Sequence, residues 1–69
     1  MDKMDKLLEK RNELIERIIF NELRDADLSN VIVTHRDFPP VSETIVTHKG
    51  EEVGRKIITN FHDLTVRYE

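Results

Sequence analysis

The chain has 69 residues, enough for one small domain and too few for a second core. It carries 11 Lys and Arg against 14 Asp and Glu, for a formal net charge of −3, and it contains no Cys. Residues 1–30 hold six basic and eight acidic side chains, and residues 31–69 hold five and six, so neither half is basic. This balance argues against binding to nucleic acid or anionic lipid, and the lack of Cys excludes thiolate and disulfide chemistry.

The expected core is small, because only 38% of the residues are hydrophobic and no disulfide can stabilise the chain. We therefore expect association with a second copy to supplement it. The absence of Cys agrees with a cytoplasmic setting. No apolar run approaches the roughly 18 residues of a membrane span, and residues 1–10 alternate in charge, so we expect neither a membrane helix nor a targeting segment.

Apolar residues at intervals of three and four predict an amphipathic helix over about residues 2–24. Asp2 is the expected N-cap, and Asp5 adds negative charge to the first turn. At about 100° per residue, the apolar positions from Met4 to Ile19 span an arc of roughly 140°, wide enough to pack on a sheet and still touch a partner helix. The full apolar set is Met4, Leu7, Leu8, Leu14, Ile15, Ile18, Ile19 and Leu23.

Two charged residues, Arg11 and Glu22, fall near the centre of this apolar face. In one interpretation, Arg11 extends its charge out from the edge of the core, and Glu22 lies beyond the packed region. In the other, two helices pair antiparallel and bring Arg11 of one chain beside Glu22 of the other. Ile15 would then lie beside Ile18, and the polar pair would fix the register of a homodimer.

Phe20 points away from the apolar face, among charged residues. A single exposed aromatic needs no function. It could instead anchor a contact with the C-terminal segment of its own chain or with a partner protein.

Beyond a loop at residues 25–30, short β-branched runs predict strands at about 31–35, 43–48, 52–59 and 64–69. Lys49-Gly50 and the segment 60–63 mark turns. These connections are too short for parallel crossovers. The predicted class is α+β, with one long N-terminal amphipathic helix followed by a small antiparallel β-meander of three to four strands, in a single domain over residues 1–69 whose β region covers about 31–69.

The segment Phe38-Pro39-Pro40-Val41 must be extended, because each proline biases the preceding residue away from the helical region. Its simplest role is a rigid connector, with Phe38 and Val41 packed against the edge of the sheet. The functional alternative is a recognition loop.

The three histidines invite a metal hypothesis, but His35, His48 and His62 match no metal-binding spacing. An up-down meander also places His48 at the opposite end of the sheet from the other two. The sequence therefore predicts no metal site.

Catalytic motifs are also missing from the sequence. Gly50 and Gly54 are the only glycines, so there is no glycine-rich phosphate loop, and neither Ser29 nor Ser42 lies in a nucleophile-elbow sequence. We expect no catalytic residue and no bound cofactor, and we predict that the protein is not an enzyme.

The sequence favours a small non-catalytic interaction or regulatory protein that binds another protein and acts as a homo-oligomer, with a dimer favoured. Compact acidic chains of this kind are also expected among inhibitors encoded by phages or mobile elements. The candidate contact residues are Arg11, Ile15, Ile18, Phe20, Glu22 and Phe38. The alternative is a nucleic-acid-binding regulator that uses Arg36, Lys49, Arg55, Lys56 and Arg67.

Overall fold

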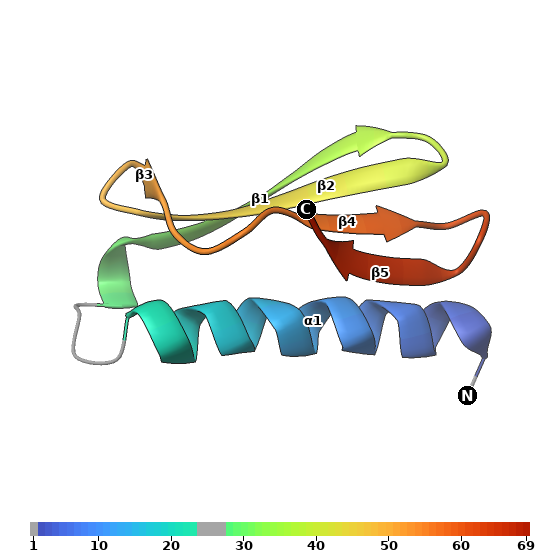
Figure 1. The fold of residues 1–69 in the computed structure, drawn as a ribbon, viewed down its shortest axis with the longest axis horizontal. Helices are drawn as coiled ribbons and strands as arrows, with labels where there is room; N and C mark the ends of the chain where they lie inside the picture. The colour runs from blue at the N-terminus through green and yellow to red at the C-terminus, as the bar shows by residue number, and fades with distance from the viewer. Residues whose placement is uncertain (1, 24–27) are drawn as a thin grey trace.

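One long helix lies along one side of an antiparallel sheet (Figure 1). The computed structural model describes residues 2–23 and 28–69. Its elements in chain order are the helix α1 (Lys3–Glu22), the 3-10 helix η1 (Leu28–Asn30) and the strands β1 (Val31–Phe38), β2 (Val41–His48), β3 (Glu51–Glu52), β4 (Ile57–Asn60) and β5 (Thr65–Tyr68). The predicted α+β class, with an N-terminal helix followed by an antiparallel sheet, is confirmed.

The start of α1 follows from its cap. Asp2 has extended backbone angles, and its carboxylate accepts a hydrogen bond of 2.8 Å from the backbone N–H of Asp5, one of the donors that a helix start leaves unpaired. At the other end, the N–H of Leu23 donates to the carbonyl of Ile19 at 2.9 Å. The predicted N-cap is confirmed, whereas the predicted helix end at Arg24 lies outside the described residues. No helix in the described part of the chain combines the length and apolar character needed to cross a membrane.

The two prolines form the turn of a β-hairpin. β1 pairs with β2 along its whole length, from Val31 opposite His48 to Phe38 opposite Val41, and the Pro39-Pro40 peptide bond between them is cis. Proline suits this position because a turn residue does not have to donate to the ladder. The expectation that Phe38 packs against the sheet edge is wrong, because its side chain is 69% exposed.

The remaining strands form a meander in the order β1-β2-β4-β5, and β3 pairs only with the end of β2. Lys49 and Gly50 both have positive φ and form the predicted two-residue turn. The predicted strand at 52–59 is wrong as one element, since residues 53–56 leave the ladder and β4 starts at Ile57. The cause is Gly54, whose φ of +69° bends the chain toward the helix.

The turn after β4 is held by the side chain of Asn60. Its amide oxygen accepts hydrogen bonds of 2.9 Å from the backbone N–H groups of His62 and Asp63. Leu64 has a φ of +58° and lies outside the following strand. β5 therefore starts at Thr65, one residue later than the alternation predicted.

The core lies between α1 and the face of the sheet that is turned toward it. The apolar side chains of the helix pack on alternate residues of β2, β4 and β5, as the period-two geometry of strands requires. The buried members of this cluster are Leu7, Ile15, Ile18, Val46, Ile57 and Val66.

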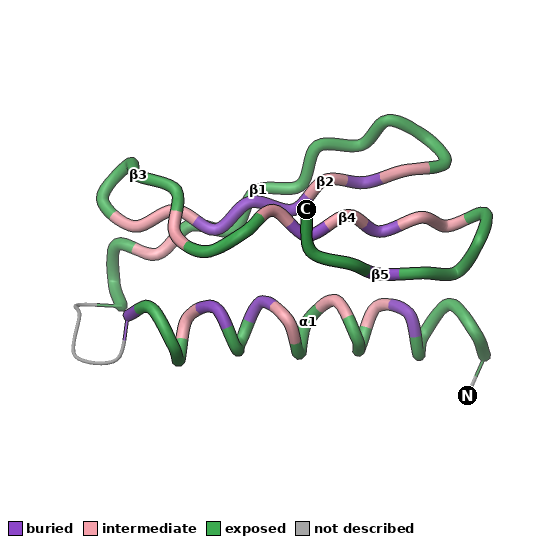
Figure 2. Tube along the Cα trace, in the orientation of Figure 1, coloured by how far each residue is buried: buried purple, intermediate pink, exposed green. Residues whose placement is uncertain are grey.

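β1 lies outside this packed region. Figure 2 shows β1 exposed over nearly its entire length, whereas its neighbour β2 is mostly buried or half-buried. Val31 is half-buried, and the other seven residues of β1 are exposed. The principal contacts of α1 are with β4, β5 and β2, so the helix leaves β1 uncovered.

The close approach of Gly54 to the helix makes a testable prediction. A Cβ at Gly54 would lie 2.8 Å from Cγ2 of Ile18, whereas a Cβ at Gly50 would meet nothing within 4 Å, and both residues have positive φ. We expect Gly54→Ala to lower the free energy of unfolding by about 2–4 kcal/mol, combining backbone strain with crowding of the core.

The matched control, Gly50→Ala, adds backbone strain without crowding, and we expect a loss of about 1–2 kcal/mol. Urea unfolding followed by circular dichroism measures both values. Equal losses in the two variants would contradict the contact with Ile18.

Candidate functional site

The helix and β1 diverge, and two openings lie between the side of α1 and the strands nearest to it. One lies near the C-terminal end of the helix and the other near the Pro39-Pro40 turn. They exist because α1 packs on β2, β4 and β5 and leaves the edge strand without a covering layer.

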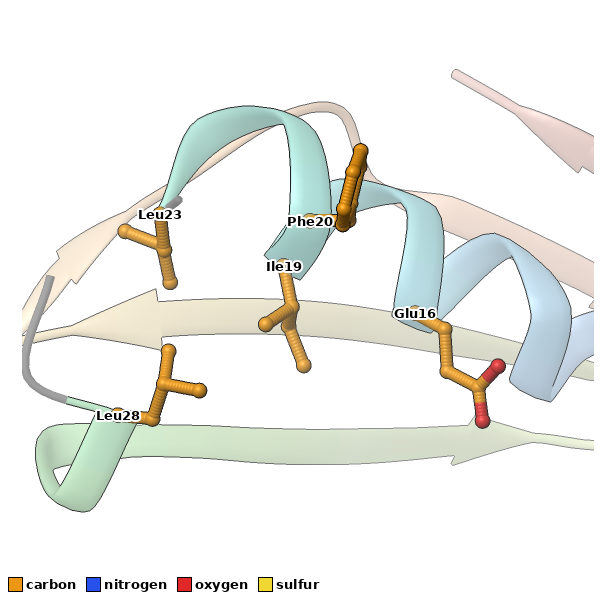
Figure 3. Close-up of a pocket in the computed structure, with 5 residues that line it drawn as sticks. All are labelled: Glu16, Ile19, Phe20, Leu23 and Leu28. Atoms are coloured by element: carbon orange, nitrogen blue, oxygen red, sulfur yellow. The ribbon is translucent and has the colours of Figure 1, made fainter. Parts of the chain in front are cut away.

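The first opening is an apolar groove of about 490 Å³ lined by Glu16, Ile19, Phe20, Leu23 and Leu28. Figure 3 shows Leu23 and Leu28 pointing toward each other across it, with Ile19 to one side of this pair and the carboxylate of Glu16 beyond Ile19. The Phe20 ring stands on the helix wall and points away from Leu28. We call this region the apolar groove. Its four hydrophobic side chains and single carboxylate suit an apolar partner surface better than a polar small molecule.

β1 follows η1, whose Leu28 lines the apolar groove, and it carries its own exposed hydrophobic residues. Ile32 is 60% exposed and Phe38 is 69% exposed, and both lie on the face of the sheet away from the helix. Val33 lies on the helix side and is also exposed. Together with Phe20 and Leu28, these residues account for most of the exposed large hydrophobic side chains of the described chain.

The second opening, of about 520 Å³, surrounds the guanidinium of Arg11. Arg11 is half-buried, and within the described residues its Nε atom is buried and makes no hydrogen bond. The other lining residues are mostly apolar and come from α1, the proline turn and the loop after β4: Leu8, Asp37, Pro39, Pro40, Val41 and Phe61. The opening therefore offers one cation, one carboxylate and apolar walls.

A row of polar side chains crosses the helix-facing side of the sheet. His35 Nδ1 lies 2.8 Å from the Thr44 hydroxyl, and the Ser42 hydroxyl donates to the Asp37 carboxylate at 2.7 Å. Both pairs join β1 to β2 across directly opposed positions. They satisfy the buried hydroxyls of β2 and hold the exposed strand in register.

The polar row does not pair a serine nucleophile with a histidine base. Ser42 is 1% exposed, and its hydroxyl donates to Asp37 rather than to an imidazole. In the described residues, no group of three or more His, Asp or Glu side chains could hold a metal ion. The polar row thus acts in strand pairing.

The local environment lowers the pKa of His35 below its ordinary value of 6.5. Partial burial is the main cause because it disfavours the charged imidazole, and the Arg11 guanidinium adds electrostatic repulsion. The Asp37 carboxylate opposes both effects. The charge of Arg11 on α1 therefore contributes to the environment of His35 on β1.

The predicted contact residues fall into two groups. Ile15 and Ile18 are buried in the core and Arg11 lines the second opening, so all three already contact their own sheet or the space beside it. An antiparallel helix seam through Ile15 and Ile18 would require the sheet to leave this face. The helix seam stays a prediction, and the packing of Ile15 and Ile18 in their own core does not favour it.

Glu22, Phe20 and Phe38 form the exposed group. Glu22 lines a shallow depression with Arg55 beside the Gly54 loop, which agrees with the interpretation that it lies beyond the packed region. Phe20, 68% exposed, lies on the wall of the apolar groove. Phe38 lies at the end of β1 next to the proline turn.

Sequence reasoning missed the parts of the site that depend on strand order. Leu28 was assigned only to a loop, although it closes one side of the apolar groove. Ile32 and Val33 were assigned to a strand, but nothing in the pattern marked that strand as an exposed edge. An apolar residue in the polar segment shortly before a strand, as at Leu28 three residues before Val31, is the local signal that could have pointed to this surface.

The basic residues of the nucleic-acid alternative do not gather in one place. Arg36 on β1 pairs with Glu43 at 3.8 Å, and Arg67 on β5, at the other edge of the sheet, pairs with Glu69 at 3.9 Å. Lys49 lies in the turn after β2, and Arg55 and Lys56 lie in the segment between β3 and β4. These five residues are thus spread over both edges of the sheet and the segments between β2 and β4, and two of them pair with carboxylates.

No family model, curated protein or solved structure matches the chain.

The pKa of His35 can be tested by NMR titration of its imidazole protons. We expect a value below 6.5, and we expect Arg11→Gln to raise it because the variant removes a neighbouring positive charge. Arg17→Gln, on an exposed part of the same helix, is the matched control and should leave the pKa unchanged. A value at or above 6.5 in the wild type would contradict the assignment.

The same pKa sets the direction of a stability change. The folded chain binds a proton at His35 less readily than the unfolded chain does. Neutral His35 therefore contributes to the free energy of unfolding above pH 6.5, and this contribution is lost as pH falls through the folded-state pKa. His35→Asn should remove that part of the pH dependence in urea unfolding.

The polar row yields a paired stability prediction. Within the described residues, the Thr59 hydroxyl is buried without a hydrogen-bond partner, whereas the equally buried Thr44 hydroxyl is bonded to His35. We expect Thr59→Val to raise the free energy of unfolding by about 1 kcal/mol, and Thr44→Val to lower it by about 1 kcal/mol. Urea unfolding measures both, and a loss of similar size in the two variants would show that Thr59 has a partner.

Proposed function

We propose that this protein is a small non-catalytic interaction or regulatory protein that acts by binding another protein. The observation that carries the proposal is the apolar groove on the side of α1, together with the uncovered strand β1. An inhibitor of the kind encoded by phages or mobile elements is one form of such a protein, and a cytoplasmic setting agrees with its lack of Cys.

The exposed hydrophobic residues support this proposal through their distribution. Single exposed apolar side chains are ordinary, whereas a contiguous apolar patch on a small domain marks an interaction surface. Phe20 and Leu28 line such a patch in the apolar groove, together with Ile19 and Leu23, and Glu16 supplies a polar rim. Ile32 and Phe38 add exposed hydrophobic area on the opposite face of the sheet. The two phenylalanines are the expected energetic anchors, because buried aromatic side chains carry much of the binding energy of interfaces.

The polar features of the chain support a binding role rather than a catalytic one. The hydroxyls of Ser42 and Thr44 bond to side chains of β1 and so take part in strand pairing. The charge of Arg11 helps to lower the pKa of His35 on β1. Chemistry would need a reactive group exposed in a water-excluding pocket. The exposed groups beside the openings are mainly apolar.

Site-specific photo-crosslinking in the cells that produce the protein tests the proposal. A photoreactive residue is placed at Phe20, at Phe38 or, as the control, at Leu64, which is also exposed but lies outside the patch. We expect the same partner protein to be crosslinked from Phe20 and Phe38 and not from Leu64.

The identified partner is then purified, and its affinity is measured for the wild type, Phe20→Ser, Phe38→Ser and Leu64→Ser. Loss of about 2 kcal/mol or more is expected for each phenylalanine and little change for Leu64. Equal binding by all four proteins would refute the proposed surface. Retention on nucleic acid at low salt with a steep salt dependence would favour the alternative function.

A further inference from the structure

The outer edge of β1 is the longest open strand edge of the described chain. β1 has eight residues and pairs with β2 on one side only, whereas β5 at the other end of the sheet has four. Native proteins usually protect such an edge with Lys, Pro, a bulge or a short strand. β1 contains neither Lys nor Pro, its pairing with β2 is continuous, and its two charged residues, Arg36 and Asp37, lie near its end.

We propose that two copies of this chain associate through β1, whose outer edge pairs antiparallel with β1 of the second copy about a two-fold axis at His35. The proposal rests on the proposed binding function and names one partner as a second copy of the chain. It differs from the helix-seam hypothesis because it leaves Ile15 and Ile18 in their own core.

Backbone geometry supplies the free donors and acceptors. The N–H of Phe61 donates to the carbonyl of Pro40 at 2.8 Å, which shows that even-numbered positions bond toward β4. In β2 the backbone N–H and C=O groups of even-numbered residues therefore point to β4, and those of odd-numbered residues point to β1. By the register of the hairpin, the even-numbered residues of β1 then bond to β2. Val33, His35 and Asp37 direct their backbone groups outward, ready to pair.

Symmetry restricts the register. A two-fold axis between antiparallel edge strands is perpendicular to the sheet, so one residue lies opposite its own copy and both helices lie on the same face. An axis at Arg36 would oppose two guanidinium groups, and an axis near Ile32 would leave half of the strand unpaired. An axis at Thr34 would place Ile32 opposite the charge of Arg36.

An axis at His35 pairs the two most exposed hydrophobic side chains of β1 with each other, and it also places Val33 opposite Asp37. It places Ile32 opposite Phe38 of the second copy, and each of these side chains is at least 60% exposed in the single chain. A β-branched residue opposite an aromatic one is a favourable cross-strand pair. Thr34 then faces Arg36, and the two imidazoles meet at the axis, where partial burial and Arg11 already favour the neutral form of His35.

The same register carries the contact beyond the strands. Val31 lies opposite Pro39 of the second copy, so the proline turn of one chain reaches the start of β1 in the other. That end of β1 adjoins Leu28 and the apolar groove. A stable interface buries about 800 Å² per partner, more than one strand edge provides, and the turn packed near Leu28 supplies additional apolar area.

Sedimentation equilibrium across a concentration series tests the association with a matched pair of variants. Val33→Pro removes an outward N–H that β2 does not use, whereas Val33→Thr keeps it. We expect a dimer for the wild type and Val33→Thr, and a monomer with an unchanged circular dichroism spectrum for Val33→Pro. A wild-type monomer at every concentration, or a dimer that survives Val33→Pro, would overturn the proposal.

Cysteine crosslinking tests the register without relying on a disruptive variant, since the chain has no Cys of its own. Under mild oxidation, His35→Cys should form a disulfide-linked dimer faster than Thr34→Cys or Arg36→Cys, and Thr65→Cys on β5 should form none at the same concentration. Fastest crosslinking at any other position would refute the axis at His35.

The two tests separate this inference from the proposed function. A monomer that still crosslinks a partner from Phe20 would refute the β1 dimer and leave the binding function standing. A dimer that crosslinks no other protein would support the β1 dimer and refute the binding of another protein.

Discussion

The packing of α1 on one face of the sheet is the interaction on which the other features of this molecule depend. Leu7, Ile15 and Ile18 meet Val46, Ile57 and Val66, and the rest of the chain is arranged around that layer. A helix with its side chains is about 10 Å wide, and neighbouring strands lie about 4.8 Å apart, so one helix covers roughly two to three strands. A four-strand ladder under a single helix must therefore leave a strand uncovered.

That constraint accounts for the two surfaces of the molecule that face outward. The helix lies over β4, β5 and the adjoining part of β2, so β1 becomes the uncovered strand. Its side chains are held by hydroxyl and imidazole contacts with β2 instead of by a hydrophobic layer. The space between the helix flank and β1 becomes the apolar groove and the opening around Arg11. The uncovered strand is thus a direct consequence of fitting one helix to this sheet.

The Gly54 loop completes the layer at the C-terminal end of the helix. By leaving the ladder after β3, residues 53–56 bring Gly54 against Ile18 and place Val53 with the core cluster. The backbone of Val53 remains tied to β2 through a hydrogen bond of 2.9 Å to Val46. A continuous strand here would have extended the sheet and left Ile18 less covered. The small core gains burial at this point from a loop rather than from a longer strand.

Local sequence by itself determined the helix, its Asp2 cap, the Lys49-Gly50 turn and the α+β class, because these depend on periodicity, capping and positive φ within a few residues. It also separated the apolar face of α1 from Phe20. It did not determine that β1 is the uncovered strand, that Gly54 interrupts the segment 52–59, or that His35 meets Thr44 and Ser42 meets Asp37. Those features depend on which strands become neighbours and on which of them the helix can cover. Pairing order and coverage arise from contacts between distant parts of the chain, so only the tertiary structure decided where the uncovered strand and the apolar groove lie.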